Sequence, residues 1–124
     1  MGLYGGIKYM LDIDKINEEL IEIKIFGDLV CVKQPTFDFC TNIAEEAGEI
    51  KRKVSMAMDE SEELAAEKSQ NDFMIKSIVD LINNNTSAKK FTANQIKKKL
   101  SPKAIRKLFE ALQNAIVGIV EDPN

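Results

Sequence analysis

The 124-residue sequence contains no histidine, only two cysteines and only three prolines. Without histidine, the chain cannot build a Ser-His-Asp or Cys-His catalytic centre, or a metal site with imidazole ligands. The cysteines, Cys31 and Cys40, form no CxxC pair, and we favour reduced packing residues over a disulfide. These absences exclude several common catalytic sites. No other catalytic constellation stands out in the sequence.

Long hydrophobic runs are also absent. The longest uncharged stretch near the C-terminus covers residues 111–120, far short of the ~20 apolar residues that span a bilayer. The first residues lack the basic start and apolar segment of a signal peptide, and Gly6 stands where a myristoylation signal requires Ser or Thr. We therefore expect a cytoplasmic protein that contacts no membrane.

The net charge of −3 is unevenly distributed along the chain. Residues 1–82 carry 9 basic and 17 acidic side chains, whereas residues 83–124 carry 8 basic and 3 acidic side chains. The N-terminal part is therefore net negative and the C-terminal part net positive. This polarity favours head-to-tail self-association, or a partner that contacts one end of the molecule.

Residues 21–36 are the part of the chain that reads clearly as β-structure. Apolar and polar residues alternate on both sides of Gly27-Asp28, which predicts a hairpin with a two-residue type II′ turn. This turn places Phe26 opposite Leu29 and Glu22 opposite Lys33, and Pro35 ends the second strand. The pattern predicts one apolar face, which consists of Ile21, Ile23, Ile25, Val30 and Val32.

The remaining segments read as helices with recognisable caps. Asp14 is a candidate N-cap for a short turn over residues 15–20, and Thr36 for a long amphipathic helix. Gly48 within that helix suggests close packing. The stretch 91–96 combines a capping box at Thr92 with a hydrophobic staple, and Ser101-Pro102 begins the last helix.

Together these patterns predict a mostly α-helical, α+β fold. A loose leader covers residues 1–9, and a short turn and the β-hairpin cover residues 10–36. A helical domain of about four helices then covers residues 37–124, and it forms a single compact domain with the hairpin. The last helix carries a continuous apolar stripe, which predicts that it is part of the core.

A cluster of glutamates is the first candidate for chemistry. Glu45, Glu46 and Glu49 lie within about one helical turn and could converge on Mg²⁺. The segment IAEEAGEI, followed by SEELAA, resembles the acidic helices of MazG-like nucleotide pyrophosphohydrolases, in which such residues hold magnesium. If Glu63 begins the second acidic element, its closing aspartate is replaced by Ala66. We favour the interpretation that these glutamates form the solvent-exposed face of a helix.

Two further clusters each allow two interpretations. The basic residues of 97–107, which include Lys97, Lys98 and Lys99, could belong to a DNA-binding helix-turn-helix, but a solvated basic face fits an acidic chain better. Met56 and Met58, together with Met74, could provide an adaptable contact surface, but core filling is the interpretation we favour.

The plan of the whole chain resembles that of phage tail assembly chaperones. The family pattern is a short N-terminal hairpin that ends in a lysine- and proline-containing turn, followed by a small helical domain. The residues that carry the resemblance are MLDIDKINEELIEIKIFGDLVCVKQPTFDFCTNI and the later FTANQIKKKLSPKAIRKLFEALQNAIV. It implies a protein of the bacterial host cytoplasm that is not an enzyme and needs no cofactor. Such a protein binds the tape measure protein or another tail protein, and it self-associates. The partner-binding residues that we predict are Ile21, Ile23, Phe26, Leu29, Cys31 and Lys33.

The hairpin also predicts an oligomer. A two-stranded ribbon has two outer backbone edges, and we expect neither to be covered within a chain of this size. Pairing with another copy or with a partner strand would cover them. We therefore expect a concentration-dependent oligomer held partly through residues 21–33, with the acidic N-terminal and basic C-terminal parts helping to set its orientation.

Overall fold

The structure of the protein is a computed structural model that describes residues 10–120. It is mostly helical, with an antiparallel β-hairpin near the N-terminus and four helices after it, which confirms the predicted fold class. The predicted leader and the last four residues lie outside the described part. The elements, in chain order, are α1 (Ile13–Asn17), β1 (Leu20–Ile25), β2 (Asp28–Lys33), α2 (Phe37–Met56), α3 (Glu60–Asn83), α4 (Ala93–Lys99) and α5 (Pro102–Val120).

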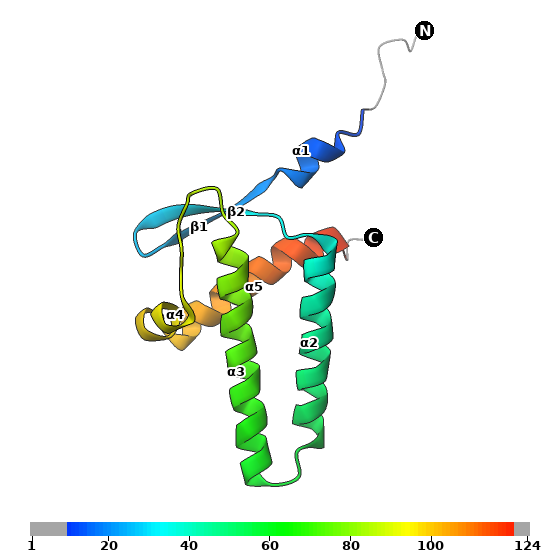
Figure 1. Ribbon diagram of the computed structural model, residues 1–124, viewed down its shortest axis with the longest axis vertical. Helices are drawn as coiled ribbons and strands as arrows, with labels where there is room; N and C mark the ends of the chain where they lie inside the picture. The colour runs from blue at the N-terminus through cyan, green and yellow to red at the C-terminus, as the bar shows by residue number, and fades with distance from the viewer. Residues whose placement is uncertain (1–9, 121–124) are drawn as a thin grey trace.

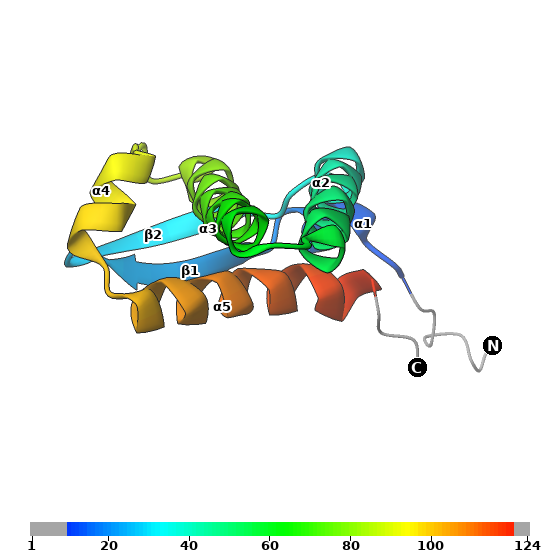
Figure 2. The same ribbon diagram turned by 90° about the horizontal axis from the view of Figure 1, so that it is seen from below.

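α3 is the central element of the fold, because it contacts α2, α4, α5 and β2. α2 and α3 form an antiparallel helical hairpin, which Figure 1 shows running down the molecule. Figure 2, which views this pair along their axes, shows the β-hairpin and α5 running across them. The core therefore lies where the C-terminal half of α3 meets β2, α4 and α5.

The core consists of apolar side chains from five elements. α3 contributes the largest group, and Ile78 and Ile82 are completely buried. The remaining members are Ile25, Val30, Val32, Ile75, Leu81, Phe91, Ile96, Ile105 and Leu112. α2 contributes no fully buried residue, although Phe39 and Ile43 pack against the core. The amphipathic stripe predicted for α2 is thus covered only in part.

The β-hairpin turns one residue earlier than the sequence pattern predicted. Ile25 pairs with Asp28, and Phe26 and Gly27 occupy the turn with φ angles of 52° and 83°. Positive φ at both central positions is the mark of a type I′ turn, whose twist matches that of the strands. The left-handed conformation is unfavourable for phenylalanine. The Phe26 ring is held by Phe91, at 6.0 Å between ring centroids, and by Lys99, whose Nζ lies 5.5 Å from its centroid.

The observed strand register therefore differs from the predicted one by two residues, and the predicted apolar face is preserved. Ile23 pairs with Val30 and Ile21 with Val32, so a two-residue shift leaves the same side chains facing the core. The predicted pairing of Glu22 with Lys33 is wrong, because Cys31 lies opposite Glu22 and Leu20 lies opposite Lys33.

The outer edge of β2 is covered by the loop that follows α3. The Lys33 amide donates to the Asn84 carbonyl (2.8 Å), and the Thr86 amide donates to the Cys31 carbonyl (3.0 Å). The Cys31 amide donates to Ser87 Oγ (3.2 Å). The expectation that the chain covers neither strand edge is therefore wrong for β2. Within residues 10–120, β1 pairs with β2 alone.

Two asparagine side chains hold this loop in place. Asn83 binds the backbone of Phe91 twice, accepting from its amide (2.7 Å) and donating to its carbonyl (2.9 Å). Asn85 donates to the carbonyls of Ile82 (2.6 Å) and Lys89 (3.0 Å) and accepts from the amides of Ser87 (2.9 Å) and Lys89 (3.2 Å). Such side-chain bonds replace the backbone pairing that a loop lacks.

Most of the predicted helix caps are confirmed. Thr36 Oγ1 accepts from the Phe39 amide, Thr92 Oγ1 from the Gln95 amide, and Ser101 Oγ from the Ala104 amide. The staple residues Phe91 and Ile96 are both buried. The first cap is wrong, because Asp12, not Asp14, caps α1 and accepts from the Lys15 amide (3.1 Å). α1 therefore begins two residues earlier than predicted.

Gly48 does not mark close packing, contrary to the sequence-based interpretation. A Cβ added at this position would meet no atom within 4 Å, and its φ angle lies outside the left-handed region. We expect Gly48→Ala to stabilise the protein by about 0.5–1 kcal/mol, because alanine loses less backbone entropy in a helix. Urea denaturation measures this, and the exposed Ala44→Gly on the same helix should cost a similar amount. A destabilised Gly48→Ala protein would contradict this expectation.

Candidate protein-binding surfaces

The segment before the β-hairpin, which we call the arm (residues 10–19), projects from the body of the protein (Figure 1). It contains α1, which has no buried residue. Its apolar side chains Met10, Leu11, Ile13 and Ile16 are between 45% and 82% exposed. A five-residue helix gains little stability from its own hydrogen bonds. The arm is therefore an apolar surface that the described chain leaves without a partner.

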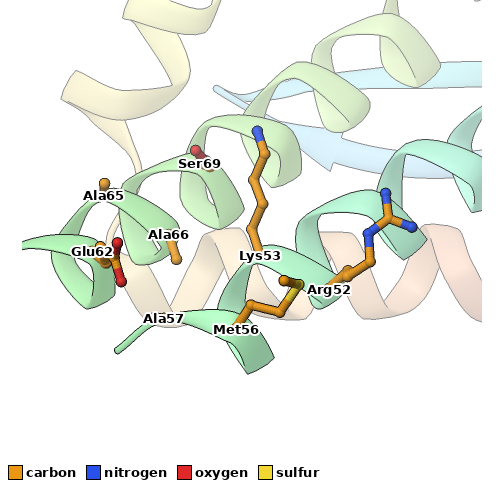
Figure 3. Close-up of a pocket in the computed structure, with 8 residues that line it drawn as sticks. All are labelled: Arg52, Lys53, Met56, Ala57, Glu62, Ala65, Ala66 and Ser69. Carbon is orange, nitrogen blue, oxygen red and sulfur yellow. The ribbon is translucent and has the colours of Figure 1, made fainter. Parts of the chain in front are cut away.

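A second exposed apolar surface lies at the tip of the α2–α3 hairpin. Here the C-terminal end of α2 and the N-terminal end of α3 enclose an open groove of about 460 Å³ (Figure 3). The groove is lined by Arg52, Lys53, Met56, Ala57, Glu62, Ala65, Ala66 and Ser69. Met56 is 67% exposed and neighbouring Met58 is 89% exposed. Core filling is therefore wrong for these two methionines, whereas Met74 packs against the core as predicted.

The local sequence explains how this tip forms. α2 ends at Met56, and the Ala57 amide donates to the Val54 carbonyl (3.4 Å). Asp59 then caps α3 by accepting from the Glu62 amide (2.8 Å). Glu62 in turn accepts from the Met58 amide (2.7 Å). This reciprocal cap reverses the chain within the three residues that separate α2 from α3.

The charges of the groove differ between its two walls. α2 carries three consecutive cations, Lys51, Arg52 and Lys53, and no carboxylate of the described residues lies within 4.0 Å of them. The α3 wall begins with acidic residues, of which Glu62 lines the groove. The groove thus offers exposed cations beside methionine and small alanine side chains.

The outer face of the β-hairpin is the third surface. It combines two exposed leucines, Leu20 and Leu29, with charged neighbours, and Leu29 is 58% exposed. Of the predicted partner-binding residues, Ile21, Ile23 and Phe26 pack against the core. Cys31 is half-buried on the outer face, and Lys33 is exposed there. The structure therefore divides the predicted set between the two faces of the hairpin.

The glutamates considered as magnesium ligands do not converge. Glu46 forms an ion pair with Lys76 (3.4 Å), whereas Glu45 and Glu49 are exposed. The nearby Asp72 binds Lys68 (3.3 Å) and Lys97 (3.6 Å), and the hydrogen bond from Lys68, with the charges of both lysines, lowers the pKa of its carboxyl. Within residues 10–120, no group of three or more acidic or cysteine side chains is placed to hold a metal ion.

The basic residues of α4 and α5 are partly engaged in the fold. Lys97 reaches Asp72, Lys99 lies over the Phe26 ring, and Lys107 approaches Glu110 at 4.0 Å. Lys98, Lys103 and Arg106 are exposed. Two of the three consecutive lysines that suggested DNA binding therefore contact other elements of the protein.

The two cysteines are free and half-buried, which agrees with the prediction of reduced packing residues. Burial raises the pKa of the Cys40 thiol, so this side chain has little thiolate character near neutral pH. Cys31 contributes its backbone to the contact with the loop after α3.

Comparison with protein-family models, with curated proteins and with solved structures finds no match to this chain. None of the helices in the described part has the length and apolar composition needed to cross a bilayer. The functional proposal therefore rests on the three surfaces described above. Sequence analysis predicted the hairpin surface but missed the arm and the groove. The methionine pair at residues 56 and 58 was the available signal for the groove.

Proposed function

We propose that this chain is a non-enzymatic phage or prophage tail assembly chaperone, which binds the tape measure protein and further copies of itself. The observation that carries the proposal is the exposure of large apolar side chains on the elements that project from the core. Exposed apolar surface of this kind is typical of sites for protein partners. The layout of hairpin and helical domain supports the same class of protein.

The outer face of the β-hairpin is the surface that we assign to the tape measure protein. Leu20 and Leu29 provide apolar contacts, and Lys33 provides a charge at the open end of the ribbon. A long helical partner exposes an apolar stripe until the tail tube surrounds it. Binding of many chaperone copies along that stripe would keep it from aggregating, because the exposed apolar surface would then be covered.

Co-expression with the tape measure protein encoded by the same genome tests this function. We expect the tape measure protein to stay soluble and to copurify with the chain, and to sediment when expressed alone. Leu29→Asp should reduce copurification at least tenfold, because it places a charge in the apolar contact. Lys98→Glu, an exposed change on α4, is the matched control.

Two results would replace this proposal. Magnesium-dependent hydrolysis of a nucleoside triphosphate, abolished by Glu46→Gln, would make the chain a MazG-like pyrophosphohydrolase. Salt-sensitive binding of duplex DNA, lost when Lys97, Lys98 and Lys99 are replaced, would make it a DNA-binding regulator. A tape measure protein that remains equally soluble without the chain would count against the chaperone.

A further inference from the structure

The arm and the groove at the α2–α3 tip lie at opposite ends of the molecule. Figure 1 shows α1 on the side where α2 begins, and the groove lies where α2 ends. α2 has 20 residues and is therefore about 30 Å long. In this arrangement a copy does not fill its own groove with its own arm, so any contact between the two surfaces joins different copies.

The two surfaces match in shape and apolarity. The arm presents a narrow element with four exposed apolar side chains. The groove is open, and small side chains, Ala57, Ala65 and Ala66, line it beside Met56 (Figure 3). Alanines leave room for larger side chains of a partner, and methionine adapts to irregular ones. A short amphipathic helix lying in an apolar groove is a recurrent mode of protein recognition.

The two surfaces also match in charge. The arm has four acidic residues, Asp12, Asp14, Glu18 and Glu19, and one basic residue, Lys15. The α2 wall of the groove carries the cations Arg52 and Lys53, and Lys51 precedes them on the same helix. The acidic α3 wall, with Glu62, fits the single cation of the arm. Asp59 accepts a hydrogen bond from the Glu62 amide, and Glu62 accepts one from the Met58 amide, which satisfies part of their negative charge.

From these observations we propose that the arm of one copy binds the α2–α3 groove of a second copy. The proposal rests on the self-association included in the proposed function, and it names the surfaces that form the contact. The contact is heterologous, because two different surfaces meet, so each copy retains a free arm or a free groove for the next one. Repetition of such a contact forms a ring or an open filament.

Two variants that each remove one side of the contact test this proposal. The arm variant is Ile13→Asp with Ile16→Asp, and the groove variant is Arg52→Glu with Met56→Glu. All four positions are exposed, so both proteins should keep the wild-type circular dichroism and denaturation midpoint. Light scattering coupled to size-exclusion chromatography should show a wild-type mass that rises with concentration and falls with added salt. Each variant alone should remain a monomer.

Mixing the two variants distinguishes this contact from a symmetric one. The arm variant keeps an intact groove, and the groove variant keeps an intact arm, so an equimolar mixture should form a 1:1 dimer and nothing larger. The matched control Lys98→Glu, an exposed change on α4 away from the arm, the groove and the β-hairpin, should assemble like the wild type. Monomers in the mixture, beside an assembling wild type, would overturn the proposal.

Two other outcomes separate this inference from the proposed function. If Leu29→Asp dissociates the oligomer while the arm and groove variants assemble normally, copies associate through the hairpin and the arm–groove contact is refuted. If the folded wild type is a monomer at every concentration, the contact is likewise refuted. In both cases, copurification with the tape measure protein tests the chaperone function independently of self-association.

Discussion

Replacing Leu112 with alanine should lower the free energy of unfolding by about 2–5 kcal/mol, the usual range for a leucine deleted from a packed core. Leu112 is completely buried in α5 and belongs to the cluster built on α3. The loss combines the transfer of the side chain to water with the cavity that remains. Urea denaturation followed by circular dichroism measures it.

Gln113→Ala is the matched control for Leu112→Ala, because Gln113 is the next residue of α5 and is exposed. We expect it to change the stability by less than about 0.5 kcal/mol. An unchanged midpoint for Leu112→Ala would show that α5 does not dock on α3. The sequence-based prediction that the last helix is part of the core would then be wrong.

Replacing Asn85 with alanine should cost about 2–4 kcal/mol, because its side chain makes four hydrogen bonds to the backbone, two of them partly buried. The change should also release the loop from the edge of β2. We therefore expect faster amide hydrogen exchange at Thr86, which donates to the Cys31 carbonyl. Denaturation and hydrogen exchange, measured on the same sample, separate global from local effects.

Asn84→Ala tests whether the loss of stability is specific to the side chain of Asn85. Asn84 is exposed, and its contact with β2 is made by its backbone carbonyl, which alanine retains. This variant should keep near wild-type stability and slow exchange at Thr86. If Asn84→Ala and Asn85→Ala are equally destabilised, the side chain of Asn85 does not hold the loop.

The residues that stabilise the fold and those of the proposed contacts lie in different parts of the molecule. The core gathers where the C-terminal half of α3 meets β2, α4 and α5, whereas the proposed contacts lie on the arm, the α2–α3 tip and the outer hairpin face. Substitutions on these surfaces should therefore change association with little effect on folding. Because the outer hairpin face and the arm–groove pair are distinct, the proposed contacts with a long partner and with a second copy do not exclude each other.

The sequence by itself determined the elements and most of their ends. The caps at Thr36, Thr92 and Ser101 join residues three apart, so the information for each lies within one helical turn. The apolar face of the β-hairpin was also predictable, because the alternation of side chains sets it and a two-residue shift does not change it. The continuous apolar stripe of α5 predicted its place in the core for the same local reason.

Only the tertiary structure decided which surfaces are covered. The turn lies at Phe26-Gly27, one residue earlier than the local pattern predicts, because the Phe26 ring is held by Phe91 and Lys99. Both residues are more than sixty positions away in the sequence. The edge of β2 is covered by the loop that follows α3, and Asn84, Thr86 and Ser87 of this loop lie more than fifty residues from the strand positions that they bind. Met56 and Met58 have the composition of core residues, yet they are exposed because α2 and α3 extend beyond the rest of the fold. Composition measures how apolar a side chain is, whereas its burial depends on which distant elements pack against it.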